Sequence, residues 1–148
     1  MMLRSMFAAV LAVAVILPAA TAAAGPIEDR QAIMKGNGRD TKMGGEMLKG
    51  VVPFDAAVAN KILANYAAAA KAFPAHFPAN SKTGGDTEAS SAIWTMPADW
   101  KIATDKFQKD TAAAAALKPT DAATFGKAFG MVTANCKTCH EGFRIKKN

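Results

Sequence analysis

The chain has 148 residues and a formal net charge of +6, from 18 basic and 12 acidic side chains. This length supports one domain with one hydrophobic core. The basic residues form no stripe with interleaved aromatic residues, which excludes a nucleic-acid-binding class of protein. The modest positive charge either favours docking to acidic partners or reflects lysines that keep helix surfaces hydrated.

Residues 1–24 have the pattern of a secretory signal peptide. Arg4 supplies a basic start, residues 6–17 form an apolar run, and residues 20–24 are small enough for cleavage. The run is shorter than the ~20 apolar residues that span a bilayer, so we expect no stable membrane insertion. An uncleaved anchor is the alternative. We therefore predict export to a periplasm and a mature domain over residues 25–148.

The mature part of the chain has helical periodicity, with no extended strand pattern and no internal repeat. A first helix is predicted over residues 27–49, although glycines within it lower its intrinsic helicity. Its inward positions are Ile27, Gln31, Met34, Met43, Met47 and Leu48. Asp55 is a candidate N-cap for a second helix. The buried positions of that helix are Ile62, Leu63, Tyr66 and Phe73.

Residues 73–86 form a predicted long loop, because prolines and glycines stop the second helix. His76 lies in this loop and is expected to face solvent rather than a metal. A third helix is predicted over residues 89–117, and Pro97 either kinks it or splits off its first turn. The anchors of this helix are Ile93, Trp94, Trp100, Phe107 and Leu117.

A fourth helix is predicted over residues 121–144. Its buried side carries Phe125, Phe129, Val132, Cys136, Cys139, His140 and Phe143. Four helices of ~20 residues with short connections predict an all-α fold, an antiparallel four-helix bundle.

Residues 136–140 read Cys-Lys-Thr-Cys-His, and this C-x-x-C-H pattern indicates a covalent attachment site for c-type haem. The two thiols add to the vinyl groups of the porphyrin, and the imidazole of His140 becomes an axial ligand of the iron. If the segment is helical, Cys136, Cys139 and His140 lie on one helix face, about one turn deep. A planar macrocycle can lie against that face, so we predict one haem c bound through both cysteines.

Other chemistries of the cysteine pair fit the sequence less well. A structural zinc site needs four ligands, and beyond this cluster the chain offers only His76. A thioredoxin-like redox pair sits at the start of a helix in a fold with alternating strands, and no strand pattern is visible. A disulfide between cysteines three residues apart is weaker still. A haem-free helical protein with a redox-active cysteine pair is the alternative that remains.

Several motifs together carry a resemblance to a known family. They are Cys136-x-x-Cys139-His140-x-x-Phe143-Arg144, Arg30-Gln31, Gly84-Gly85-Asp86 and Ile93-Trp94. The chain resembles the class II cytochromes c, that is, cytochrome c prime and its relatives of the cytochrome c556 type, over nearly all of its mature length. The resemblance implies a four-helix bundle, of which cytochrome c prime is itself an example. It also implies His140 as the proximal ligand and thioether links at Cys136 and Cys139.

The sixth position of the iron separates two branches of this family. In the five-coordinate, gas-binding branch the distal residue is apolar, often Leu or Phe, and the resemblance implies that Met34 occupies this position here. A thioether can ligate haem iron, and a His/Met pair stabilises the reduced state. Bundle geometry agrees, because Met34 and His140 each lie roughly 10 Å from the same end of antiparallel neighbouring helices.

Other methionines are weaker candidates for the sixth ligand. Met43 and Met47 lie a further ~13 to 20 Å along the first helix, and Met131 lies on the haem's own helix at the wrong height. Met96 lies at the correct end and is the best rival. The alternative role for Met34 itself is distal packing, which is what methionine usually does in a core.

The resemblance implies further site residues with less specific roles. It suggests that Arg30 and Gln31 lie near the haem edge and propionates, where a guanidinium can pair with a carboxylate. It suggests that Arg144 lies on the proximal side and that Trp94 and Phe143 line the haem pocket. Each charged residue could equally be a hydrated surface group.

We therefore expect a periplasmic mono-haem electron carrier with low-spin iron held by His140 and Met34. The alternative is a five-coordinate cytochrome c prime that binds nitric oxide or carbon monoxide. No paired acid and base groups suggest a substrate pocket, so we do not predict an enzyme. The expected partners are redox proteins, acidic ones in particular, and the resemblance suggests a homodimer through the first two helices.

Overall fold

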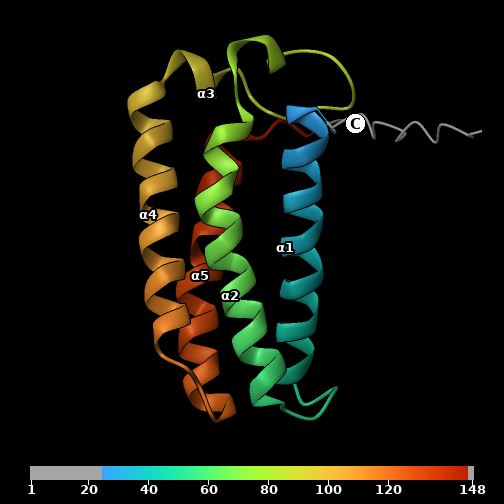
Figure 1. Ribbon diagram of the computed structural model, residues 1–148, viewed down its shortest axis with the longest axis vertical. Coiled ribbons are helices and arrows are strands. Elements are labelled where there is room, and N and C mark those ends of the chain that lie inside the picture. Colours follow the sequence, from blue (N-terminus) through green and yellow to red (C-terminus); the bar gives the residue numbers. More distant parts are fainter. Residues whose placement is uncertain (1–24, 147–148) are drawn as a thin grey trace, which may run out of the picture.

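Four long helices form the body of the molecule in the computed structural model, which describes residues 25–146 (Figure 1). The elements in chain order are α1 (Pro26–Leu48), α2 (Ala56–Ala72), the 3-10 turns η1 (Phe73–His76) and η2 (Ala79–Ser81), α3 (Ala92–Thr95), α4 (Pro97–Ala116) and α5 (Ala122–Phe143). The predicted signal peptide lies outside the described residues. Within residues 25–146, no helix is long and apolar enough to cross a membrane.

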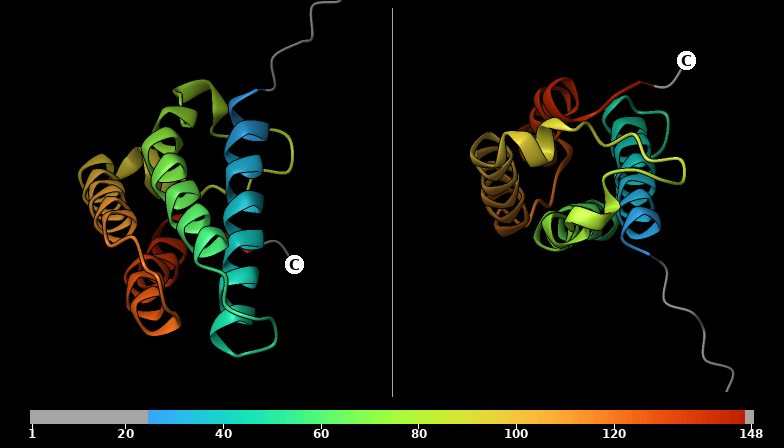
Figure 2. Two further views of the ribbon diagram at one scale, coloured as in Figure 1. Left: turned by 60° about the horizontal axis from the view of Figure 1, so that its bottom comes forward. Right: turned by 90° about the horizontal axis from the view of Figure 1, so that it is seen from above.

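Successive long helices run in opposite directions. In Figure 1, α1 descends, α2 rises, α4 descends and α5 rises. Seen from above, the four helices follow one another around the bundle in the order α1, α2, α4, α5, so α1 is flanked by α2 and α5 (Figure 2). The predicted antiparallel four-helix bundle is confirmed. The beginning of α1 and the end of α5 therefore lie at the same end of the molecule.

The helix boundaries follow from local capping chemistry. The carboxylate of Asp55 accepts hydrogen bonds of 2.8 and 3.0 Å from two N–H groups in the first turn of α2. Asp121 caps α5 by accepting a 2.8 Å hydrogen bond from the N–H of Thr124. Such caps satisfy N–H groups that have no partner within the helix. At the other end of α1, Gly50 adopts a φ of +70°, a left-handed conformation that glycine takes at little cost.

The predicted third helix is divided in two. The turn of α3 ends at Thr95, and α4 begins at Pro97, with Met96 between them at a φ of −125° and ψ of 59°. A proline is well suited to the first turn of a helix because its nitrogen has no hydrogen to donate. The split of the first turn that Pro97 suggested is confirmed.

The hydrophobic core fills the end of the bundle where α1 ends and α5 begins. It comprises Met47, Ala59, Ile62, Leu63, Tyr66, Ala114, Phe125, Ala128, Phe129 and Val132. Gly44 is buried on α1, and a methyl group added there would collide with the ring of Phe129 on α5. A residue without a side chain thus lets α1 approach α5 closely at this level.

Three hydrophobic residues predicted to point inward are exposed, and so is His140 on α5. The exposed fractions are 41% for Met43, 38% for Leu48 and 48% for Leu117. In the C-terminal half of α1 the buried positions are Gly44 and Met47, which lie three residues apart on one face. Met43 and Leu48 each lie one residue, or about 100°, off this face. Leu117 follows the last residue of α4, where the chain leaves the bundle.

Candidate haem site

A cavity of about 800 Å³ lies at the end of the bundle opposite the core, a volume typical of cofactor pockets. All four long helices and the segment between α2 and α4 contribute to its walls. The lining includes Arg30, Gln31, Met34, Asn37, Gly38, Thr41, Tyr66, Phe73, Phe77, Trp100, Thr104, Phe107, Asn135, Cys136, Cys139, His140, Phe143 and Arg144. Most of these side chains are apolar or aromatic, so the walls suit a large hydrophobic group.

The last two turns of α5 form one wall of the cavity and carry the C-x-x-C-H motif. Cys136, Cys139 and His140 all line the cavity from this helix, as the spacing predicted. Both cysteines are free, and burial raises the pKa of both thiols. A redox-active pair would require a lowered thiol pKa. The site therefore does not resemble that of a thioredoxin-like protein.

The imidazole of His140 has the properties of a neutral ligand. Desolvation by neighbouring groups, together with the charge of Arg144, lowers its pKa. Only an unprotonated ring nitrogen can bind iron, so this shift favours ligation. Within the part of the chain that the structure describes, no three His, Cys, Asp or Glu residues are grouped to hold a metal ion by themselves. The zinc interpretation therefore gains no support from the described residues.

A second part of the cavity wall is the cavity-facing stripe of α1, formed by Met34, Asn37, Gly38 and Thr41. These residues follow the helical spacing i, i+3, i+4 and i+7. The amide nitrogen of Asn37 lies 4.0 Å from the sulfur of Met34. At Gly38, an added Cβ would meet nothing within 4 Å. The stripe thus combines one soft ligand atom with free space one turn further along α1.

Met34 is the one methionine that lines the cavity among residues 25–146. Met47 is buried in the core, while Met43 and Met131 are largely exposed. The rival Met96 lies at the junction of α3 and α4 with 49% of its surface exposed. Among the methionines of residues 25–146, only Met34 therefore lines the cavity that His140 also lines.

The deep end of the cavity is closed by a pair of hydroxyl groups. Tyr66 on α2 and Thr41 on α1 share a 2.7 Å hydrogen bond, and Thr41 also donates to the backbone oxygen of Asn37. Burial is the main reason why the pKa of Tyr66 rises to about 12. The phenol therefore stays neutral at physiological pH.

Arg30 is buried, and its guanidinium group binds the segment between α2 and α3. It donates hydrogen bonds to the backbone oxygens of His76 and Ser81, at 3.0 and 2.8 Å, and to the hydroxyl groups of Ser81 and Thr87. It also lies 4.8 Å from the ring centroid of Phe77. Arg30 thus lines the cavity, but four of its five N–H groups are already used to hold this segment.

Gln31 also contacts this segment, because its amide nitrogen donates a 3.0 Å hydrogen bond to the backbone oxygen of Asp86. His76 lies outside the cavity, with its Nδ1 atom 3.5 Å from a carboxylate oxygen of Asp29. The sequence interpretation of His76 as a surface group rather than an iron ligand agrees with this position.

Aromatic side chains from α4, α5 and the segment after η1 form another part of the cavity wall. Trp100 contacts Phe77 and Phe143, with ring centroids 4.9 and 5.1 Å apart. Trp94, which we expected to line the pocket, is not among the lining residues. Its indole N–H instead donates to the backbone oxygen of Phe77, behind the wall. Trp100 and Phe77 are therefore site residues that the sequence interpretation missed.

The end of α5 is fastened to the segment before α3. Arg144 donates a 2.5 Å hydrogen bond to the carboxylate of Glu88. Backbone hydrogen bonds run from Ser90 to the oxygen of Phe143 and from Ile145 to the oxygen of Glu88, each 2.9 Å long. These contacts fix the rim of the cavity next to His140.

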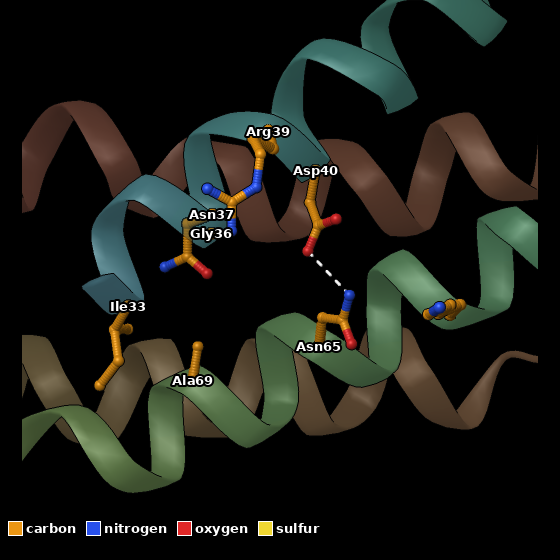
Figure 3. Close-up of a pocket in the computed structure, with 8 residues that line it drawn as sticks. Ile33, Gly36, Asn37, Arg39, Asp40, Asn65 and Ala69 are labelled. Atoms are coloured by element: carbon orange, nitrogen blue, oxygen red, sulfur yellow. Dashed lines mark hydrogen bonds between the residues drawn. The ribbon is translucent and has the colours of Figure 1, made fainter. Parts of the chain in front are cut away.

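A second, smaller hollow of about 380 Å³ lies between the outer faces of α1 and α2 (Figure 3). Its most prominent contact is a 3.0 Å hydrogen bond from Asn65 to Asp40. Gly36 and Ala69 leave the space because they have little or no side chain. This hollow brings together no cysteine, histidine or methionine, so it offers no ligand set comparable with the larger cavity.

The sequence model of the cytochrome c′ family matches residues 25–144, which span both walls of the cavity and all the helices. The chain belongs to the cytochrome c′ family. A cytochrome c′ of Rhodopseudomonas palustris is 47% identical over 124 residues, covering 82% of this chain and 83% of that protein. A cytochrome c-556 of Agrobacterium fabrum is 38% identical over 125 residues, covering 84% of each chain.

The fold of the cytochrome c′ family is also reproduced in detail. A solved structure of cytochrome c′ from Rhodopseudomonas palustris superposes with a TM-score of 0.77 at 42% identity, covering 84% of this chain and 99% of that one. Membership of this family means that the protein carries covalently bound haem c. Cys136 and Cys139 are the only cysteines in the chain, and both face the cavity. The cytochrome c′ family and the cavity therefore agree on the cofactor.

Proposed function

We propose that the protein is a periplasmic electron carrier in which His140 and Met34 ligate the iron. The observation that carries this proposal is that Met34, on α1, lines the same cavity as the C-x-x-C-H motif on α5. Bound haem would supply one-electron exchange between ferric and ferrous iron. A thioether ligand favours the ferrous state and raises the reduction potential. Ligation by both His140 and Met34 would keep the iron low-spin, so that its bonding would change little on reduction.

The aromatic lining residues support a role in electron transfer. Phe73, Phe77, Trp100, Phe107 and Phe143 exclude water from the cavity, which limits solvent reorganisation when the charge of the iron changes. The net positive charge of the chain supports redox partners with acidic surfaces.

A homodimer through α1 and α2 is part of the same proposal and is tested by light scattering. Export is tested by N-terminal sequencing of the mature protein.

Gas binding is the second candidate function, and the free space at Gly38 favours it. A Cβ at this position would meet nothing within 4 Å, so the side chain of Met34 has room to move aside. A small ligand such as carbon monoxide or nitric oxide could then reach the iron. The two candidates differ in whether Met34 is bound to iron at rest.

Optical spectra of the purified haem protein, with and without carbon monoxide, separate the two candidates. A His/Met-ligated protein shows sharp low-spin ferrous bands, a weak far-red sulfur-to-iron band in the ferric state and little reaction with carbon monoxide. We expect Met34→Leu to convert this protein to a high-spin form that binds carbon monoxide readily. Met96→Leu is the matched control and should leave the spectrum unchanged. A wild-type ferric spectrum that is already high-spin would refute the electron-carrier proposal.

A further inference from the structure

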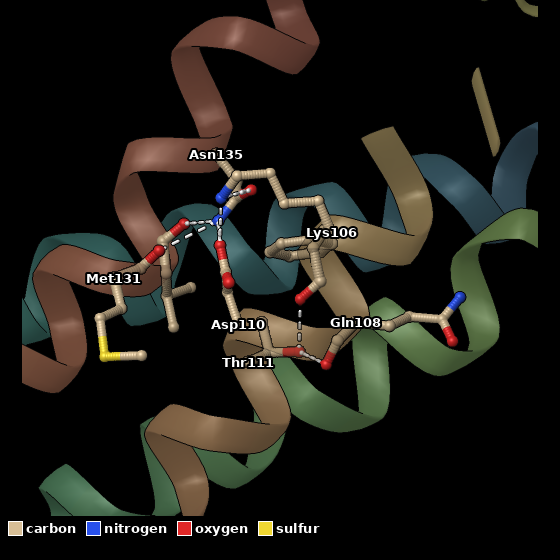
Figure 4. Close-up of polar contacts among 8 residues, drawn as sticks. Lys106, Gln108, Asp110, Thr111, Met131 and Asn135 are labelled. Carbon is tan, nitrogen blue, oxygen red and sulfur yellow. Dashed lines mark hydrogen bonds and ion pairs between the residues drawn. The ribbon is translucent and has the colours of Figure 1, made fainter. Parts of the chain in front are cut away.

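A closed polar network joins α4 to α5 beside the haem-attachment motif (Figure 4). The amide nitrogen of Asn135 donates a 2.9 Å hydrogen bond to the carboxylate of Asp110. Lys106 forms an ion pair with the same carboxylate oxygen and donates a 3.3 Å hydrogen bond to the amide oxygen of Asn135. The three side chains therefore contact one another in a ring.

The position of Asn135 links this ring to the cofactor. Asn135 is only 8% exposed, directly precedes Cys136, and lines the haem cavity. Thr104 and Phe107 line the cavity from the same part of α4 that carries Lys106. The charges of Lys106 and Asp110 thus lie within one or two helical turns of residues that face the haem.

A second ion pair on α4 differs from the pair of Lys106 and Asp110 in how far its side chains are exposed. Lys101 and Asp105 have the same i, i+4 spacing, but their side chains are 74% and 56% exposed. The corresponding exposed fractions are 62% for Lys106 and 21% for Asp110. Asp110 is therefore the shielded carboxylate of the two. Its pKa is lowered by the hydrogen bonds from Lys106 and Asn135, so it is ionised at neutral pH.

We propose that Lys106 and Asp110, coupled through Asn135, form a positioning and charge-compensating network that sets the reduction potential of the haem. The carboxylate of Asp110 stabilises the more positive ferric site, and the ammonium group of Lys106 offsets this effect. Asn135 fixes both groups relative to the attachment helix. The proposal requires bound haem, but it does not depend on Met34 being an iron ligand.

Because Lys106 and Asp110 carry opposite charges, removing each charge should shift the reduction potential in opposite directions. A purely structural role of the network would not predict opposite shifts. Lys106→Met uncovers the carboxylate, so the ratio of ferric to ferrous protein at a fixed ambient potential should rise roughly three- to tenfold, as for a unit charge in a partly shielded site. Asp110→Asn should lower the same ratio by a similar factor. The double variant removes both charges and should return to within about twofold of the wild type.

Lys101→Met and Asp105→Asn are the matched controls, because they change the net charge of the same helix equally. They also lie beside lining residues, Trp100 and Thr104, so they resemble the tested pair in position. They are expected to shift the ratio by less than about twofold, because both members of this pair are exposed and screened by water and salt, whereas Asp110 is shielded. The measurement is a spectroelectrochemical titration of each haem-loaded variant. Circular dichroism checks that each variant is folded. If Asp110→Asn does not fold, the proposal is tested by comparing the shift in Lys106→Met with the shift in Lys101→Met.

Two results would overturn the proposal. One is a shift of the same sign in Lys106→Met and Asp110→Asn, which would indicate a loosened structure. The other is a shift in Lys106→Met no larger than that in Lys101→Met, which would indicate a net-charge effect only. Repeating the titration in a Met34→Leu background separates this proposal from the one on ligation, because the opposite signs should persist whether or not sulfur binds the iron.

Discussion

Replacing Gly44 by alanine should destabilise the bundle, because α1 and α5 are in close contact at this position. A Cβ at residue 44 would collide with Cε2 of Phe129 and lie 3.0 and 3.1 Å from Cδ2 and Cζ of the same ring. Carbon atoms in proteins pack favourably at ~3.5–4.0 Å, so all three contacts are too short.

The ring of Phe129 has little room to move away. It is 8% exposed, and its centroid lies 5.4 Å from that of Phe125 and 6.4 Å from that of Tyr66. Overpacking of this kind costs ~1–3 kcal/mol. Alanine recovers ~1 kcal/mol of helix propensity relative to glycine. The net loss in the free energy of unfolding is therefore up to ~2 kcal/mol.

Gly45→Ala is the matched control for this prediction. It lies on the same helix, and its Cβ would meet nothing within 4 Å, so it should gain the ~1 kcal/mol without a collision. The two variants should differ by ~1–3 kcal/mol, or ~4–12 °C in thermal midpoint for a domain of this size. Thermal unfolding of the haem-loaded variants by circular dichroism measures this difference. Equal midpoints, or a more stable Gly44→Ala, would refute the assigned close contact.

Two further predictions concern single polar residues. Arg30→Lys keeps the positive charge, but lysine cannot donate to all four oxygen acceptors of Arg30. We therefore expect the free energy of unfolding in urea to fall by about 3 kcal/mol and proteolysis between residues 76 and 87 to become faster. Unchanged proteolysis would contradict the role of Arg30. Hydrogen bonds from Thr124 lower the pKa of the Asp121 carboxyl group in the folded state. The charge of Asp121 therefore stabilises the protein above pH ~4, and this stabilisation is lost as the pH falls through the folded-state pKa. Asp121→Asn, which keeps the cap, should therefore lose less stability than the wild type between pH 7 and pH 3, as measured by urea unfolding at each pH.

Local chemistry was sufficient to predict most of the fold. The cap at Asp55 and the break at Pro97 depend on neighbouring residues only, so the sequence predicts them directly. The C-x-x-C-H spacing likewise predicts one helix face, and Cys136 and Cys139 both line the cavity. Inward orientation near helix ends was less predictable, as Leu48 and Leu117 illustrate.

Contacts between distant segments could not be read from the sequence. The hydrogen-bond acceptors of Arg30 lie 46 to 57 residues away along the chain. No local pattern indicates that Arg30 donates hydrogen bonds to the segment between α2 and α3. Trp94 and Trp100 were both expected to anchor one helix, but the break at Met96 places them on separate helices, and only Trp100 lines the cavity. Asn135 looked like an ordinary residue beside the motif, because its partners on α4 are 25 and 29 residues away.

The hydrogen bonds between the end of α5 and residues 88–90 bear on the order in which the protein is assembled. Glu88 and Arg144 are 56 residues apart in the chain, so the cavity rim beside His140 forms only once α5 has packed against the rest of the bundle. Long-range closure of this kind is slow because the ordering entropy must be lost before the contacts form. The attachment cysteines would thus remain accessible for haem addition until these contacts form.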